Sequence, residues 1–124
     1  MNFNTKQRRA ILDVLEIADH PLSPQEIFDK VSQSGESVNL STVYRSVSAL
    51  VQRGTLEEVR LPGESSRYEF SGKGHHHHFR CRKCNRVLVI EKCAADVNSM
   101  VPPGYIVEDH DLYIYGICAE CTSQ

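Results

Sequence analysis

The chain has no apolar stretch long enough to cross a bilayer, and its N-terminus has no apolar run typical of a signal peptide. It also has no low-complexity segment and no internal repeat. An excess of charge of one sign is missing too, since 14 basic and 16 acidic residues leave a net charge of −2. We therefore expect a cytoplasmic protein with one ordinary domain or two very small ones, and bulk charge does not indicate its partners.

Four of the five cysteines form two Cys-x-x-Cys pairs, Cys81 with Cys84 and Cys118 with Cys121. In a reducing cytosol, paired cysteines are more typical of metal binding than of disulfides. Thiolates two residues apart can direct both sulfurs at one ion, and two pairs complete a tetrahedral set suited to Zn²⁺. Because 33 residues separate the pairs, rather than the usual ~15–20, a small subdomain must lie between them. The spacing predicts a structural zinc.

Four consecutive histidines precede the first pair: His75, His76, His77 and His78. On a strand, side chains alternate between the two faces, so His76 and His78 point one way and His75 and His77 the other. The run can therefore serve two separate metal sites. Imidazole suits Zn, Fe, Ni, Cu or Mn, so the run does not identify the ion.

Apolar residues at helical spacing predict three helices in the first 54 residues. The first covers residues 5–18. The second begins with Ser23-Pro24-Gln25-Glu26, which has the capping-box pattern. Either Asn39 or Ser41 can cap the third, which Gly54 ends.

Residues 55–60 and 67–70 are predicted to form a hairpin, with residues 61–66 as its loop. Three helices followed by a hairpin make a winged helix-turn-helix, whose third helix enters a DNA major groove. Thr42, Tyr44 and Arg45 lie on the face of that helix predicted to be exposed, and we expect Tyr44 and Arg45 to reach bases and phosphates. The alternative is a small helical bundle whose outer face is polar simply because it is solvated.

Residues 71–74 form the expected hinge between a first domain at 1–70 and a second at 75–124. Strands are predicted at residues 86–91, 105–110 and 112–117, with a short helix at 94–101. The predicted fold class is α+β, a winged-helix domain followed by a small α/β domain. We do not expect an enzyme, because the four-sulfur site is closed and the sequence has no nucleophile motif or phosphate-binding loop.

Residues 5–121 resemble the ferric-uptake-regulator family of metal-responsive bacterial repressors. The resemblance rests on several motifs together: Gln7-Arg8, Ser41-Thr42-Val43-Tyr44-Arg45, Ser66-Arg67-Tyr68-Glu69, His75 to His78 with the first cysteine pair, and Leu112-Tyr113-Ile114-Tyr115-Gly116 with the second.

That resemblance implies a homodimer in which metal at the hinge holds the DNA-binding domains in register. The implied structural zinc is held by the four paired cysteines. The implied hinge site takes Glu69, His76 and His78, with His20 from the N-terminal domain, and a further site takes His75, His77, Asp96 and His110. The implied DNA-binding residues are Tyr44, Arg45, Thr42, Ser41, Lys6, Arg8 and Arg9.

The sequence departs from the family pattern at one acidic ligand, whose position falls on Val89. The nearest carboxylate, Glu91, has the same strand parity, and a two-residue insertion would restore the alignment. Cys93 can replace or assist Glu91, although an unpaired cysteine is also a common small buried hydrophobe.

The resemblance implies a metal-dependent repressor of metal-homeostasis genes that binds double-stranded operator DNA. Peroxide-sensing relatives have aspartate where this chain has Glu69, which argues against that branch. Glu69 and three histidines would accept Fe²⁺, Mn²⁺ or Zn²⁺. A soft Cys93 ligand would favour zinc, so a zinc-responsive regulator is preferred, with iron- or manganese-responsive regulators as alternatives. A metal-binding protein without DNA binding is the remaining alternative.

Overall fold

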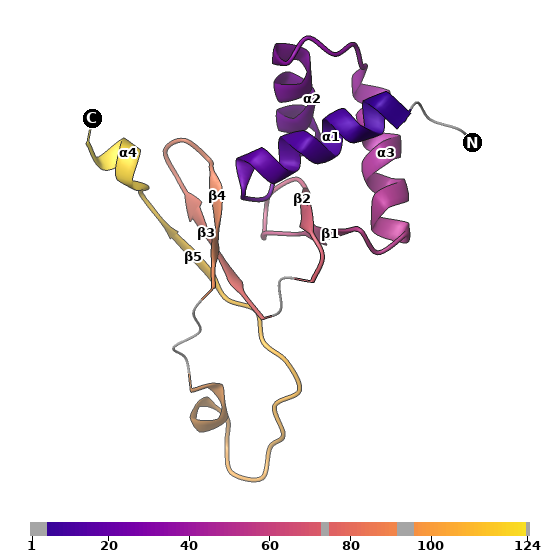
Figure 1. Ribbon diagram of the computed structural model, residues 1–124. Coiled ribbons are helices and arrows are strands. Elements are labelled where there is room, and N and C mark those ends of the chain that lie inside the picture. The colour runs from indigo at the N-terminus through magenta and orange to yellow at the C-terminus, as the bar shows by residue number, and fades with distance from the viewer. Residues whose placement is uncertain (1–4, 73–74, 92–95, 124) are drawn as a thin grey trace. The chain divides into compact units, whose positions relative to one another are not determined.

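The computed structural model describes residues 5–72, 75–91 and 96–123. The chain divides into two compact units, residues 1–73 and 74–124. The first contains α1 (Thr5–Ala18), α2 (Pro24–Gln33), α3 (Leu40–Gln52), β1 (Leu56–Val59) and β2 (Arg67–Phe70) (Figure 1). The second contains β3 (His77–Cys81), β4 (Val87–Ile90), the 3₁₀ helix η1 (Val97–Met100), β5 (Tyr113–Gly116) and α4 (Ala119–Thr122). The α+β class predicted from the sequence is confirmed.

The helices of the N-terminal unit begin and end where local sequence favours it. In α2, the Ser23 side chain accepts from the Glu26 N–H, and the Glu26 carboxylate accepts from the Ser23 N–H, so the predicted capping box is formed. Of the two candidates for α3, Asn39 is the N-cap, and its side chain accepts from the Thr42 N–H at 2.8 Å. These three bonds satisfy amide groups at the helix starts that have no partner within the helix.

An apolar core holds the three helices and the first strand together. Its buried members are Ile11, Leu15, Leu22, Ile27, Val31, Val43, Val47, Leu50 and Leu56. They come from all three helices, from β1 and from the segment between α1 and α2. The unit therefore has a complete hydrophobic core of its own, the main source of folding free energy for a small domain.

The wing, which is the hairpin of β1 and β2, is attached to the helical part of the unit at two places. Strands β1 and β2 pair antiparallel, and Tyr68 of β2 exchanges two backbone hydrogen bonds with Leu22. Arg67 is 5% exposed and donates to the Glu26 carboxylate at 2.9 Å. Since Glu26 also caps α2, one carboxylate links the start of that helix to the wing.

The C-terminal unit is a three-stranded sheet with β3 at its centre. β3 runs antiparallel to β4 and parallel to β5, and Phe79 is opposite Leu88 on one side and Ile114 on the other. Gly116 lies against the Phe79 ring, since a Cβ there would be 3.2 Å from Phe79 Cζ. Any larger residue at position 116 would have to displace that ring.

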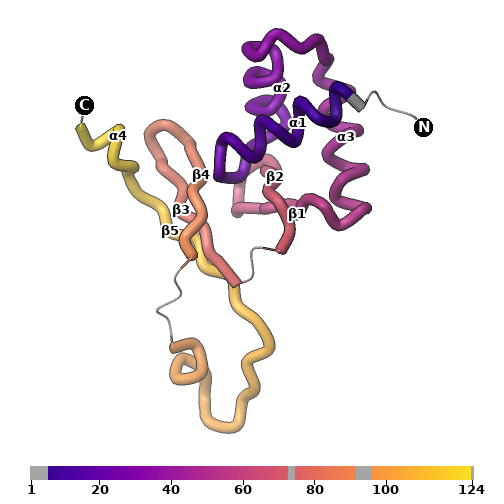
Figure 2. The backbone as a smooth tube through the Cα atoms, in the orientation of Figure 1, coloured from indigo at the N-terminus to yellow at the C-terminus, as the bar shows by residue number. Residues whose placement is uncertain are grey.

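Two sequence predictions for this unit are wrong. Residues 105–110, predicted as a strand, have no regular secondary structure, and Figure 2 shows an open excursion of the chain before β5. A strand needs a neighbour for its backbone groups, and this segment has no ladder partner among the residues that the structure describes. The helix predicted at 94–101 is only the single turn η1 in its described part.

None of the described helices is both long and apolar enough to traverse a membrane.

Candidate metal centres and nucleic-acid interface

The two Cys-x-x-Cys pairs meet at one point of the C-terminal unit. Cys81 ends β3, Cys84 follows in a turn, Cys118 is the N-cap of α4 and Cys121 lies within that helix. The sulfurs of Cys81 and Cys121 are 3.8 Å apart, as are those of Cys84 and Cys118. An ion about 2.3 Å from each of four tetrahedral sulfurs would separate them by about 3.8 Å. The cluster therefore has the dimensions of a four-thiolate zinc site.

Backbone amides favour the thiolate form of one of the four cysteines, Cys81. The N–H groups of Cys84 and Cys118 both donate to the Cys81 sulfur at 3.4 Å. These bonds favour the thiolate and lower the pKa of Cys81 to about 6. A thiolate is the form that binds metal. The turn between Cys81 and Cys84 continues into Asn85, which has a positive φ of 69° and accepts from Arg80 Nε at 2.8 Å.

Three histidines meet at a second point of the same unit. His110 Nε2 lies 3.1 Å from His75 Nε2 and 3.2 Å from His77 Nε2. Three imidazole nitrogens about 2.0–2.1 Å from one ion would have similar mutual distances. Burial, followed by the neighbouring imidazoles of His75 and His110, lowers the pKa of His77 and favours its neutral, metal-binding form.

The other two histidines of the run form a separate pair. The rings of His76 and His78 are 4.9 Å apart between centroids, and His78 stacks on Tyr113 at 6.4 Å. β3 begins only at His77, yet His75 still groups with His77 and His76 with His78. This division into two sets is the one predicted from the alternation of side chains along a strand, and the two sets face different neighbours within the unit.

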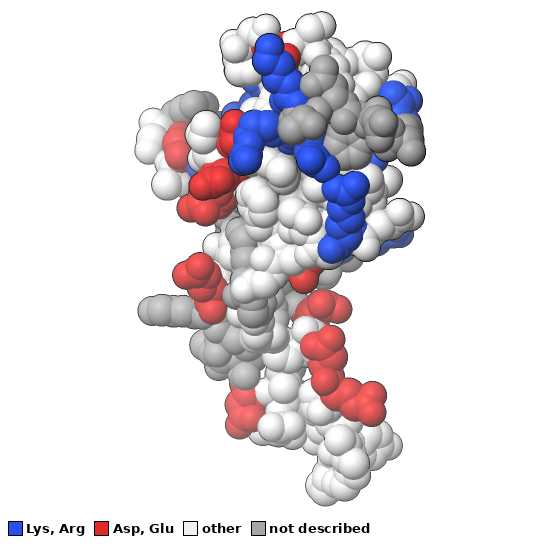
Figure 3. Space-filling model, turned by 45° about the vertical axis from the view of Figure 1, so that its right-hand side comes forward, with Lys and Arg blue, Asp and Glu red and all other residues white. Residues whose placement is uncertain are grey.

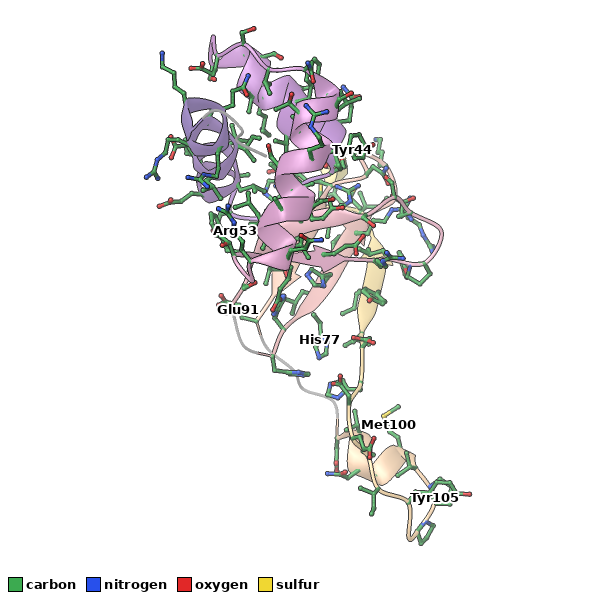
Figure 4. All side chains as sticks on the ribbon, turned by 90° about the vertical axis from the view of Figure 1, so that its right-hand side faces the viewer. Tyr44, Arg53, His77, Glu91, Met100 and Tyr105 are labelled. Carbon is green, nitrogen blue, oxygen red and sulfur yellow. The ribbon has the colours of Figure 1, made fainter. Side chains whose placement is uncertain are left out.

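Among the described residues of the C-terminal unit, the predicted ligands Asp96 and Glu91 join none of these clusters. Asp96 is exposed at the start of η1, and among the described residues it does not join His75, His77 and His110. Glu91 is exposed directly after β4, where Figure 4 labels it. Cys93 lies outside the described residues. Glu69 is a buried residue of β2, and His20 Nδ1 contacts the Ala18 carbonyl. If Nδ1 donates there, Nε2 has the lone pair that a metal ligand needs.

The exposed face of α3 is the candidate DNA-reading surface. Tyr44 is 52% exposed, and Arg45 is exposed beside it. The same stripe continues along the helix through the exposed residues Ser41, Ser48 and Gln52. Gln52 was not predicted from the sequence, although it lies eight positions after Tyr44 and so falls on the same helical face.

Thr42 differs from the expectation of an exposed DNA-contacting residue. It is only 7% exposed, and its hydroxyl accepts from Arg45 Nη2 at 3.2 Å. Its position one residue after Ser41 turns it toward the core side of the helix. Thr42 therefore orients Arg45 rather than presenting its own side chain to solvent.

The first turns of α1 contain the predicted phosphate-contacting residues Lys6, Arg8 and Arg9. Lys6 and Arg9 are exposed, and Arg8 is half-buried.

Comparisons with known proteins agree with this arrangement. A model of the ferric uptake regulator family matches residues 3–115. A ferric uptake regulation protein of Legionella pneumophila is 34% identical over 94% of this chain and 89% of its own length. A zinc uptake regulation protein of Mycobacterium tuberculosis is 32% identical over 97% of this chain and 95% of its own length. The solved ferric uptake regulator of Francisella tularensis with iron superposes with a TM-score of 0.75 at 27% identity, covering 98% of this chain and 95% of that one. The chain belongs to the ferric uptake regulator family.

Proposed function

We propose that this protein is a metal-dependent, DNA-binding transcriptional repressor of metal-homeostasis genes, acting as a homodimer. The observation that most supports a sensor is the presence of two separate histidine sets next to a closed cluster of four cysteines. A closed site suits a permanent structural ion, whereas sites built from histidines suit an ion that exchanges. One chain then has both a stable fold and a response to metal.

The hinge site is proposed to use His76 and His78 with Glu69, and with His20 from the N-terminal unit. Ligands from both units would make one arrangement of the units more stable when the ion is bound, and this differential stability is what a switch requires. The second site is proposed at His75, His77 and His110, where three Nε2 atoms converge.

Zinc is the preferred regulatory ion, with iron and manganese as alternatives. One of the relatives described above is named for zinc uptake and another for ferric uptake, so similarity alone does not choose between these metals. Imidazole and carboxylate ligands accept all three ions. A ligand role for Cys93 or Glu91 remains a prediction, and sulfur there would favour zinc.

DNA contact is proposed through α3 and α1. Tyr44 and Arg45 would reach base edges, while Ser41, Lys6, Arg8 and Arg9 would contact the DNA backbone.

A second copy of the chain is proposed to cover exposed apolar side chains of the C-terminal unit. These include Tyr105, which is 69% exposed, Ile106, which is 88% exposed, and Ile114, which is 42% exposed. Large exposed apolar groups on a small unit favour a protein interface.

The test is binding of a DNA fragment from upstream of the protein's own gene. The protein would keep its cysteine-bound zinc and lose its exchangeable metal, and Zn²⁺, Fe²⁺ and Mn²⁺ would be titrated separately without oxygen. We expect one ion to restore sequence-specific binding, and Tyr44→Ala to abolish specificity without changing metal content. His78→Ala should keep the dimer but lose the metal dependence. If the histidine sites fill and no ion restores specific binding, the protein is a metal buffer or a metal-independent regulator.

A further inference from the structure

A hollow of about 330 Å³ lies between α1 and the end of α3 in the N-terminal unit. Its lining residues come from the two helices, from the C-cap of α3 and from the residue before β1: Arg8, Arg9, Leu12, Leu50, Arg53 and Thr55. Figure 4 labels Arg53 and Tyr44 toward opposite ends of α3. The exposed stripe reaches Gln52, next to Arg53, but none of the stripe residues lines the hollow.

The lining is strongly positive. Three of its six residues are arginines, and none is acidic. The carboxylate of Asp13 is 3.9 Å from Arg9, but both side chains are more than half exposed, so this pair neutralises little of the charge. Figure 3 shows Lys and Arg side chains gathered on this unit. Guanidinium groups that share one hollow repel one another, and a bound anion would relieve that repulsion.

The backbone around Arg53 is held in one conformation. Gly54, with φ of +80°, donates to the Val51 carbonyl, and Thr55 donates to the Leu50 carbonyl at 2.9 Å. These two bonds are a Schellman motif, which ends the helix and satisfies its last carbonyls. Arg53 and Thr55 therefore leave the helix in a fixed turn. Leu12 and Leu50 supply apolar walls, beside which charge interactions are stronger than in open water.

We propose that this hollow is a binding site for a phosphate-class oxyanion, held by Arg9 and Arg53 with the Thr55 hydroxyl. A guanidinium can bind two oxygens of one phosphate, which suits paired arginines better than isolated lysines. The favoured source is a backbone phosphate of the operator, and this assignment rests on the proposed function.

The share of α1 in the hollow supports a DNA source. Arg53 lies nine positions after Tyr44, which at about 100° per residue puts it on the side of the helix axis opposite Tyr44. It would therefore not read base edges together with Tyr44. The hollow instead joins Arg53 to Arg9, one of the α1 residues proposed to contact backbone phosphates. The hollow would then fix the register of the recognition helix without reading sequence.

The first experiment compares Arg53→Gln with Lys30→Gln. Both substitutions remove one exposed positive charge, but Lys30 lies in α2 and does not line the hollow. We expect Arg53→Gln to weaken operator and random DNA by similar factors and to reduce the slope of log affinity against log salt by about 1. Lys30→Gln should keep the wild-type slope.

The second experiment adds inorganic phosphate to the DNA-free protein and follows the Arg53 Nε–H and Thr55 amide signals by NMR. In the wild type we expect both signals to shift with added phosphate until the site is saturated. In Arg53→Gln the Thr55 amide signal should not shift. Shifts that depend on Arg53 with an unchanged salt slope would support the site but assign it to a free anion, which overturns the DNA source. If neither measurement depends on Arg53, the proposal is wrong. A wild-type protein that does not prefer operator DNA would contradict the proposed function. The phosphate titration would still show whether the hollow binds an oxyanion.

Discussion

The two units of this chain are stabilised by different chemistry. In the N-terminal unit, nine apolar side chains form a buried core. In the described part of the C-terminal unit, six residues are buried, and five of them are cysteine or histidine: Cys81, Cys118, Cys121, His77 and His78. Val87 is the sixth. Side chains that could bind metal occupy the interior of the second unit, where the first unit has valine, leucine and isoleucine.

We infer from this difference that the folding of the C-terminal unit depends on metal and that the folding of the N-terminal unit does not. A small sheet with few buried aliphatic groups has little hydrophobic free energy to offset the entropy of ordering its chain. A structural zinc site can supply about 10–16 kcal/mol of apparent binding free energy. We infer that zinc does for the C-terminal unit what the apolar core does for the N-terminal unit.

The largest expected effect is that of Cys118→Ser. It removes one of the four converging sulfurs, so we expect loss of the zinc, unfolding of the C-terminal unit and loss of the dimer. Zinc content, the melting curve and the mass in solution would measure this. Ala119→Ser, which adds the same hydroxyl at the exposed position next to Cys118, is the control and should change none of the three. If Cys118→Ser kept the melting curve and mass of the wild type, zinc would not be what stabilises the C-terminal unit.

A cavity in the apolar core should have the converse effect. Ile27 is fully buried, so Ile27→Ala should lower the free energy of unfolding of the N-terminal unit by about 2–5 kcal/mol. Zinc content should be unchanged. Ile17 is 84% exposed, and Ile17→Ala should stay within about 0.5 kcal/mol of the wild type. Urea unfolding of the two variants checks this, and loss of zinc from Ile27→Ala would show that the units do not fold independently.

His110→Ala tests whether the histidine cluster is separate from the structural site. The variant removes the nitrogen that lies near both His75 and His77. The metal affinity of the histidine cluster should fall by more than the roughly 10–100-fold that losing an outer-shell partner costs. The cysteine-bound zinc should remain, and the melting curve should change little. Metal titration after dialysis measures both quantities. If the variant loses all its zinc, the histidine cluster also stabilises the fold.

The smallest effect is expected at the capping box. Ser23→Ala removes the acceptor for the Glu26 N–H and should destabilise the N-terminal unit by about 1 kcal/mol. Ser32 is exposed within α2, so Ser32→Ala provides a control without a cap. Urea midpoints of the two variants check this. Equal midpoints would show that the link from Arg67 to Glu26, rather than the cap, holds the start of α2.

Local sequence signals predicted the N-terminal unit well because its elements are determined by local interactions. The bounds of α1, the capping box of α2 and the end of α3 near Gly54 all follow from residues within a few positions of one another. The error at Thr42 is one of helical phase, since a single residue separates the exposed stripe from the buried side.

Convergence of distant residues could not be predicted from local patterns. The meeting of His110 with His75 and His77 depends on the path of the chain between β4 and β5, and only the family resemblance suggested it. The hollow brings together Arg9 and Arg53, which are 44 positions apart and have no spacing that marks them as neighbours. The false strand at residues 105–110 arose because the aromatic and β-branched residues Tyr105, Ile106 and Val107 indicate strand propensity but do not supply a pairing partner.

The most direct test of the zinc account is an amide NMR spectrum of the zinc-loaded protein before and after complete chelation of metal. We predict that signals of the C-terminal unit, such as those of Phe79, Val87 and Gly116, collapse into the unfolded region. Signals of Ile11, Val31 and Val47 in the N-terminal core should keep their positions. Collapse of both sets together, or persistence of both, would contradict the claim that zinc replaces an apolar core in one unit only.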